Sequence, residues 1–154
     1  MMEYDELLTL IPHKGKMMLL NRVTDYNTKE KSIEAEYNVT DECIFYDPVI
    51  NGIPSWTGFE FIAQSVSVFL GLEEKAKGKL PRLGFILGVS QVKIDIPVFT
   101  TGCTLKIKAK EAENEYPVIY YTGDIFINDK KVFSGRLTVM DADDEQLKIL
   151  SGGL

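Results

Sequence analysis

The stretch that decides the fold is residues 54–72, PSWTGFEFIAQSVSVFLGL. Its apolar side chains fall on every side of an α-helix, and they are Phe59, Phe61, Ile62, Ala63, Val66, Val68, Phe69, Leu70 and Leu72. A helix that is apolar all round is a buried helix. Such a helix would be roughly 25 Å long, about the width of a small domain. Residues 54–72 therefore predict one central helix around which the rest of the chain folds.

Two polar residues interrupt this apolar helix. Glu60 and Gln64 are four residues apart and so share one face. Two interpretations of Glu60 stay open. The run Thr57-Gly58-Phe59-Glu60 fits a capping box, in which the glutamate binds back to the first amide of the helix. Alternatively, Glu60 is a general acid or base near the helix start, in an apolar pocket where desolvation favours the protonated carboxyl.

Segments with strand and turn patterns flank the helix. The predicted elements are a short helix over residues 3–10, strands over 17–23, 32–40, 83–98, 105–113, 118–127 and 132–140, and polar turns over 24–31 and 128–131. Strands around a single apolar helix are typical of an α+β fold with an antiparallel sheet. Because one sheet covers only one side of the helix, we expect a second subunit on the other side, with a second sheet layer as the alternative.

Length and composition predict one soluble domain. The 154 residues are expected to form a single domain with a core over residues 7–140, and residues 141–154 stay unassigned. The net charge of −6 argues against nucleic-acid binding. Cys43 and Cys103 lie far apart without metal-ligand spacing, so we expect no metal or other cofactor and a reducing compartment. No signal peptide or membrane span is predicted, which indicates a cytoplasmic protein.

Three segments carry a family resemblance. Residues 10–23 read LIPHKGKMMLLNRV, residues 54–64 place a proline six residues before Glu60, and residues 84–88 read GFILG. In the same order, they resemble the L-x-P-H-x-x-P-F-L-L-V-D-R-V, P-G-x4-E-A-M-A-Q and G-F-L-A-G segments of 3-hydroxyacyl-acyl-carrier-protein dehydratases. The resemblance implies a hotdog fold, in which a curved antiparallel sheet wraps around one long helix, usually in dimers or multiples of dimers.

The closer resemblance is to a divergent branch, the hotdog dehydratase-like proteins found with aryl-polyene and related type II polyketide systems. Residues 52–64 are similar to the G-x-P-x-W/F-x-x-x-E-x-M-A-Q helix of that branch. The catalytic histidine of the standard enzymes lies in a G-H-F-P loop, fourteen residues before the helix glutamate. The residue at that position here is Tyr46, in Phe45-Tyr46-Asp47-Pro48.

The resemblance implies dehydration of 3-hydroxyacyl thioesters carried on acyl carrier protein, in fatty-acid or polyketide synthesis. Glu60 is then the acid for the leaving hydroxyl, and His13, the single histidine, is the base for the Cα proton. The alternative for His13 is a structural role at the end of the first helix, where it would bind backbone carbonyls. Tyr46 is the fallback catalytic residue.

Further residues have supporting roles in this hypothesis. The backbone N–H groups of Ser55 and Trp56, at the helix start, are candidate donors to the substrate oxygen. Gln64, one turn after Glu60, is placed to orient the carboxyl by a hydrogen bond. A basic rim would attract the acidic carrier protein or else be a solvated helix end. Its members are Lys14, Lys16 and Arg22 near the first predicted strand, and Lys75, Lys77, Lys79 and Arg82 after the helix.

Two other functions stay open. One is an acyl thioesterase, because hotdog thioesterases also place a carboxylate on the central helix. The other is a non-catalytic acyl-binding subunit that pairs with an active hotdog dehydratase, which would supply the missing histidine. A homodimer and a heterodimer with another hotdog protein are both compatible with the sequence.

Overall fold

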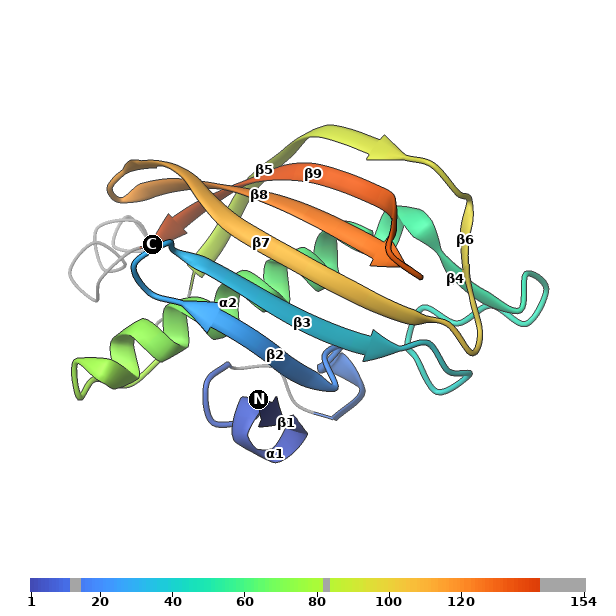
Figure 1. Ribbon diagram of the computed structural model, residues 1–154, viewed down its shortest axis with the longest axis horizontal. Coiled ribbons are helices and arrows are strands. Elements are labelled where there is room, and N and C mark those ends of the chain that lie inside the picture. The colour runs from blue at the N-terminus through green and yellow to red at the C-terminus, as the bar shows by residue number, and fades with distance from the viewer. Residues whose placement is uncertain (12–14, 82–83, 142–154) are drawn as a thin grey trace, which may run out of the picture.

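A curved antiparallel sheet wraps around one long helix (Figure 1) in the computed structural model, which describes residues 1–11, 15–81 and 84–141. The elements are β1 (Met2–Glu3), α1 (Tyr4–Leu7), η1 (Gly15–Met17), β2 (Arg22–Asn27), β3 (Ser32–Asn38), β4 (Gly52–Pro54), η2 (Ser55–Thr57), α2 (Gly58–Ala76), β5 (Gly84–Ile94), β6 (Val98–Thr100), β7 (Thr104–Glu115), β8 (Val118–Ile127) and β9 (Lys130–Asp141). The main sheet has the order β1-β2-β3-β7-β8-β9-β5, and β4 pairs with β6 in a small second sheet. The predicted α+β architecture is confirmed.

The central helix α2 begins and ends four residues later than predicted. The chain enters it through the 3-10 turn η2, because Pro54 is extended and residues 55–57 turn before the α-helix starts. At the other end the helix continues through Glu74, whose side chain is buried. It ends at Ala76, and Gly78, two residues further on, has a φ of +72°. The N–H groups of Gly78 and Lys79 donate to the carbonyls of Lys75 and Glu74, which is the Schellman pattern of helix ends.

The capping-box interpretation is wrong for Thr57. Its backbone is already helical, and its hydroxyl makes no cap hydrogen bond to the helix amides. Instead, Thr57 Oγ1 donates to the Pro54 carbonyl at 2.7 Å. The Thr57 hydroxyl that a capping box would need is therefore hydrogen-bonded within the 3-10 turn. A catalytic role for Glu60 remains compatible with the structure.

Both the sheet and the N-terminal segment cover α2. The concave face of the sheet supplies buried side chains at every second position of β3 and β7, among them Ile33, Ala35, Leu105, Ile107 and Ala109. On another side, residues 7–11 and 15–20 of the N-terminal segment bring Leu7, Leu10, Leu19 and Leu20 into the same core. The N-terminal segment therefore covers part of the helix surface that was expected to meet a second subunit. A strip formed by Glu60, Ala63 and Ser67 stays half-buried.

One strand prediction and one turn prediction are corrected by the structure. The apolar run 17–23 is not a strand throughout, because Met17 ends η1, and Leu19 and Leu20 are buried in the segment between η1 and β2. Residues 24–27, predicted as a turn, complete β2. The hairpin prediction is confirmed. Asn128 and Asp129 have φ values of 49° and 63°, as a two-residue type I′ turn between β8 and β9 requires.

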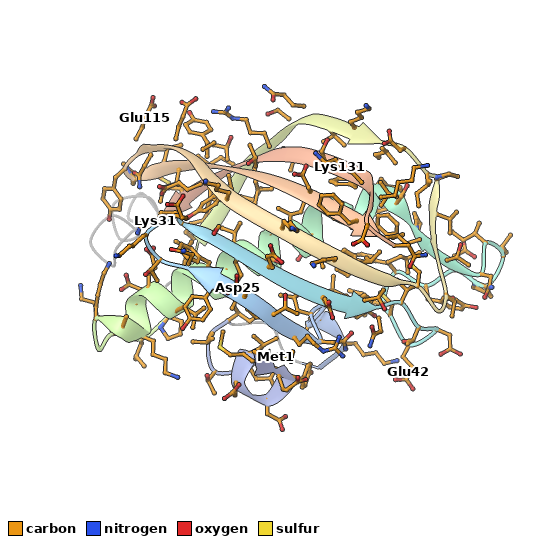
Figure 2. All side chains as sticks on the ribbon, viewed as in Figure 1. Met1, Asp25, Lys31, Glu42, Glu115 and Lys131 are labelled. Carbon is orange, nitrogen blue, oxygen red and sulfur yellow. The ribbon has the colours of Figure 1, made fainter. Side chains whose placement is uncertain are left out.

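The outer face of the sheet is polar. Lys106, Lys108 and Lys110 alternate with buried residues along β7 and point away from the helix. Ion pairs join them to the neighbouring strand and turn, with Lys108 3.1 Å from Glu34 and Lys110 3.4 Å from Glu30. Figure 2 shows polar side chains standing along this face over β3 and β7. The outer face is therefore a solvated surface, and it gives no support to a second sheet layer.

We expect Gly71→Ala to lower the free energy of unfolding by about 1–2 kcal/mol. Alanine favours a helix over glycine by about 1 kcal/mol. However, a Cβ at position 71 would lie 2.4 Å from the Leu10 carbonyl oxygen, and backbone cannot move away cheaply. Urea unfolding measures the difference. Gly135→Ala is the control, because the nearest atom to its Cβ is at an ordinary 3.6 Å. A Gly71→Ala protein as stable as wild type would show that the N-terminal segment is not held against α2.

Candidate active site

Glu60 lies in the first turn of α2 at a groove of about 310 Å³ between that helix and the edge of the sheet. The wall residues are mostly apolar: Ala63, Val66 and Leu70 from α2, Phe85 and Ile86 from β5, and Leu137 and Val139 from β9. Ser67, one turn further along than Ala63, adds a hydroxyl to the helix wall. Between Glu60 and Leu70 the helix rises roughly 15 Å. The Glu60 carboxyl is therefore at one end of a long, mostly apolar groove.

The Glu60 carboxyl is less enclosed in the single chain than the sequence predicts. The residue is half-buried, whereas we expected an acid enclosed by apolar side chains. The cause is the opposite wall, because β5 is exposed along its whole length and leaves the groove open on that side. Full enclosure of Glu60 therefore requires something that covers β5.

Gln64 lies beside Glu60, as their spacing predicts. Its Nε2 atom is 3.3 Å from Glu60 Oε1 and 2.8 Å from the Met17 carbonyl oxygen. Its Oε1 atom accepts a hydrogen bond from the Leu19 N–H at 2.8 Å. Only 1% of Gln64 is exposed, so water does not compete for these contacts. The sequence did not indicate the contacts with residues 17 and 19, which come from a distant part of the chain.

The helix start offers one of the two predicted oxyanion donors. The Ser55 N–H donates to the Pro97 carbonyl at 3.0 Å, so it is already engaged and the prediction for Ser55 is wrong. The Trp56 N–H stays a candidate, since it lies in the turn immediately before α2, where the helix dipole favours negative charge. The Trp56 side chain is exposed, and its ring packs against Phe45 with 6.3 Å between centroids.

The described residues do not complete a catalytic pair with Glu60. His13 and Arg82 lie outside the described residues, so the predictions for them stay open. Tyr46 is half-buried, and its hydroxyl makes a long contact of 3.5 Å with Asn51 Oδ1. Tyr46 is not among the residues that line the Glu60 groove. Within one chain, Tyr46 is therefore not shown to reach the Glu60 carboxyl.

Tyr37 and the two cysteines have structural surroundings. The Tyr37 ring packs against Phe61, the neighbour of Glu60, with 5.1 Å between centroids. Burial, together with a hydrogen bond to Cys43, raises the pKa of Tyr37 above its ordinary value, so the phenol stays neutral. Burial also raises the pKa of the Cys103 thiol and disfavours the reactive thiolate.

The rim lysines that follow the central helix are at the other end of α2 from Glu60. Lys75, Lys77 and Lys79 are exposed, and Lys77 Nζ is 3.4 Å from Glu74. Seventeen residues of helix separate position 77 from position 60, which is roughly 25 Å. A docking role for the rim stays a prediction, and within one chain Lys75, Lys77 and Lys79 do not line the groove.

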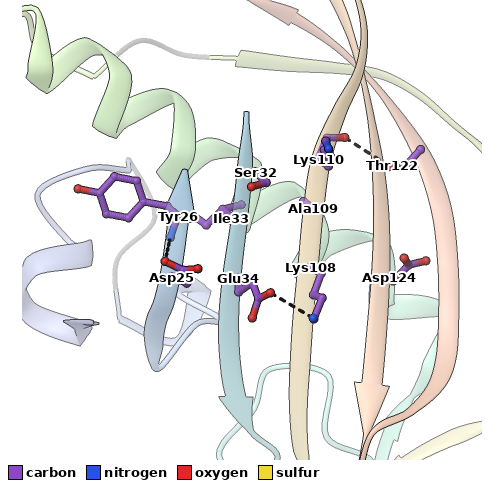
Figure 3. A pocket seen from close by; sticks show the side chains of 10 residues that line it. All are labelled: Asp25, Tyr26, Ser32, Ile33, Glu34, Lys108, Ala109, Lys110, Thr122 and Asp124. Atoms are coloured by element: carbon purple, nitrogen blue, oxygen red, sulfur yellow. Dashed lines mark hydrogen bonds and ion pairs between the residues drawn. The ribbon is translucent and has the colours of Figure 1, made fainter. Parts of the chain in front are cut away.

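A second hollow, of about 190 Å³, lies on the outer face of the sheet (Figure 3). Figure 3 shows Lys108 and Glu34 pointing toward each other across β7 and β3, and Asp25 and Tyr26 at its rim. Lys108 and Glu34 form an ion pair across it, on a solvated face. This hollow has neither an apolar wall nor a connection to Glu60, so the groove along α2 is the better candidate for a site.

No helix within residues 1–11, 15–81 and 84–141 is long and apolar enough to cross a membrane. In the same part of the chain, no three histidine, cysteine, aspartate or glutamate side chains are grouped as metal ligands.

Solved structures identify the fold. The dehydratase heterocomplex ApeI:P from Xenorhabdus doucetiae superposes with a TM-score of 0.83 at 23% identity, over 94% of this chain and 95% of that chain. A putative thioesterase related to phenylacetic acid degradation, from Ralstonia eutropha, superposes with a TM-score of 0.60 at 17% identity, over 77% and 83%. With its curved antiparallel sheet around α2, the chain has the hotdog fold.

The particular family follows from the sequence comparisons. Residues 6–150 match the ApeP-like family model, described as ApeP dehydratase, and the chain belongs to that family. The FabZ 3-hydroxyacyl-[acyl-carrier-protein] dehydratase of Legionella pneumophila is 26% identical over 138 residues, 88% of this chain and 91% of that enzyme. The Chlamydia caviae FabZ enzyme is 35% identical over 92 residues, which span 57% of this chain and only 58% of that enzyme. The predicted resemblance, including the divergent branch, is confirmed.

Proposed function

We propose that this chain is a subunit of a dehydratase for 3-hydroxyacyl thioesters carried on acyl carrier protein, in fatty-acid or polyketide synthesis. The observation that carries the proposal is Glu60 at one end of an apolar groove, beside the start of α2. The apolar walls fit the hydrocarbon part of an acyl chain, and the carboxyl fits the reacting end. Membership of the ApeP-like family and similarity to FabZ enzymes support the reaction class.

In the proposed reaction a base removes the proton on Cα, and Glu60 protonates the hydroxyl on Cβ. The C–O bond breaks, water leaves, and the electron pair from the Cα–H bond forms the carbon–carbon double bond. Negative charge that develops on the thioester oxygen would be stabilised by the Trp56 N–H at the helix start. We assign the base to an imidazole, either His13 or a histidine from a second hotdog subunit. Tyr46 stays the fallback.

The proposal includes a second hotdog chain against β5. This edge strand has eleven residues, all exposed, and Lys93 is its single charged residue. Its exposed large apolar side chains are Phe85, Ile86, Leu87, Val89, Val92 and Ile94. Edge strands of stable monomers are typically short, charged or covered. A partner strand along β5 would satisfy the free backbone groups and close the groove over Glu60.

The partner is either a second copy or a different hotdog protein. The related Xenorhabdus doucetiae structure is a heterocomplex of ApeI and ApeP, which supports the heteromeric arrangement. In that arrangement the other chain would supply the imidazole that Tyr46 replaces in this sequence.

Thioester hydrolysis is the second candidate function. The structural similarity to the Ralstonia eutropha putative thioesterase supports it. In this case Glu60 would activate water to attack the thioester carbonyl, and the acyl chain would leave as a free acid.

The products of one assay separate these functions. The purified chain, alone and together with a co-expressed hotdog dehydratase, is incubated with a 3-hydroxyacyl acyl carrier protein, and the bound chain is analysed by mass spectrometry. We expect loss of 18 Da, the mass of water, from the carrier-bound chain. Release of the free 3-hydroxy acid would contradict dehydration and would show that the protein is a thioesterase. An unchanged carrier conjugate in both samples would instead favour an acyl-binding subunit.

A further inference from the structure

We propose that the backbone of residues 17–19 fixes the orientation of the Glu60 carboxyl and acts through the Gln64 side chain, which makes Gln64 a positioning residue. This inference rests on the proposed dehydratase function and names the device that aims its acid. It assigns a role in the site to the N-terminal segment, which does not itself line the groove.

The Gln64 side chain occupies the place of a strand residue beside Met18. Its Nε2 atom donates to the Met17 carbonyl at 2.8 Å, and its Oε1 atom accepts from the Leu19 N–H at 2.8 Å. One amide that binds the carbonyl before a residue and the N–H after it reproduces the pairing of a parallel β-ladder. The amide plane is therefore held at both ends by backbone.

These two contacts determine which way the amide faces. The Leu19 N–H can only donate and the Met17 carbonyl can only accept, so exchange of the amide nitrogen and oxygen would break both bonds. With 1% of Gln64 and 1% of Leu19 exposed, water could not replace the contact between them, and the buried Leu19 N–H would be left unsatisfied. The second N–H of the amide is then directed to Glu60 Oε1, at 3.3 Å.

This orientation gives the two oxygens of Glu60 different tasks. Oε1 faces a group that donates and cannot accept, so Oε1 is an acceptor in either protonation state. When the carboxyl carries a proton, that proton is on Oε2. The Cβ hydroxyl of the substrate must therefore approach Oε2. Contacts of this kind are often long without substrate and shorten in the reacting complex, which fits the 3.3 Å separation.

A measurement that does not depend on activity tests the geometry. The NMR spectrum of the ¹⁵N-labelled protein contains two side-chain amide protons of Gln64. One is hydrogen-bonded to the Met17 carbonyl oxygen and the other to Glu60 Oε1. We expect Glu60→Ala to shift the second proton strongly and the first little. The control Ser65→Ala, on the same helix with its hydroxyl bound to the Phe61 carbonyl, should shift neither. If Glu60→Ala changed the chemical shift of neither Gln64 side-chain amide proton, the inference would be overturned.

Kinetics tests whether Gln64 acts through Glu60. Gln64→Met keeps the volume and removes the donor, and we expect kcat for dehydration to fall about 100-fold with KM changed by less than about threefold. In the Glu60→Gln background, the same change should cost less than about twofold, because there is no acid left to orient. Independent, multiplicative losses would contradict a positioning role.

A second variant covers the case in which Gln64→Met does not fold. Gln64→Glu, protonated in this buried site, keeps an acceptor for the Leu19 N–H and one donor for the Met17 carbonyl, but it has no second donor for Glu60, so the same loss in kcat is expected. The outcomes distinguish the two proposals. If the wild-type protein forms no enoyl product, the dehydratase function fails and the amide-proton measurement still decides the geometry. If Glu60→Gln abolishes dehydration and Gln64→Met does not reduce it, only the positioning role fails.

Discussion

Replacement of Glu60 by glutamine should reduce dehydration about 1,000-fold, since general acid catalysis contributes 10²–10⁴-fold. Glutamine keeps the size of the side chain and can still accept a hydrogen bond from Gln64. It cannot deliver a proton to the leaving hydroxyl. We therefore expect the fold and the affinity for the acyl chain to be retained while the rate of enoyl formation falls. The rate is measured on a 3-hydroxyacyl carrier-protein substrate with the full assembly.

A matched control for Glu60→Gln is available on the same helix. Glu73 pairs with Lys31 near the far end of α2, and Glu73→Gln removes an equal charge without touching the groove. Its rate should stay within about twofold of wild type, because partly exposed ion pairs contribute little. If Glu60→Gln retained full activity, the proton donor would have to be another group, and the apolar groove would lose its assigned reaction.

Introducing charge on β5 should abolish both assembly and activity. Leu87 and Val92 are 56% and 46% exposed in the single chain. We expect Leu87→Lys/Val92→Lys to change a stable two-chain assembly into monomers at micromolar concentration. Two ammonium groups would have to be desolvated in an apolar interface, at a cost of several kcal/mol per ion. Analytical ultracentrifugation measures the mass, and the dehydration assay measures the rate.

The control for the β5 variant is Leu80→Lys, which adds a lysine at a side chain that is 85% exposed beyond the end of α2. Its mass and activity should match wild type. A wild-type protein that is monomeric and active would refute the partner-strand proposal. It would mean that the groove works while it is open along β5.

The fold was predictable where one periodicity determined both the element and its buried face. Alternation of Leu105, Ile107 and Ala109 with lysines predicted both the strand and its orientation, and the structure buries those three residues. The run 17–23 was wrongly predicted because burial against a helix gives the same apolar composition as a strand. Leu19 and Leu20 are buried in this way, before β2 begins.

Only the part of the site that α2 contributes was predictable from the sequence. The spacing of Glu60 and Gln64 placed both side chains on one face, and that adjacency is observed. The opposite wall comes from β5 and β9, whose approach depends on tertiary structure. For the same reason the sequence did not reveal that the Pro97 carbonyl engages the Ser55 N–H. Contacts between distant segments decide which backbone groups stay available, and local patterns do not encode them.

The two edges of the main sheet differ in a way that limits growth of the assembly. At the edge opposite β5, β1 consists of only two residues, paired with β2 over Met2–Val23 and Glu3–Arg22. So short a strand offers almost no template for further pairing. Once a second copy of this chain occupies β5, neither chain of the pair presents another long free edge in the described part of its main sheet. We therefore expect pairing through sheet edges to stop at two chains, without fibril formation even in concentrated solution.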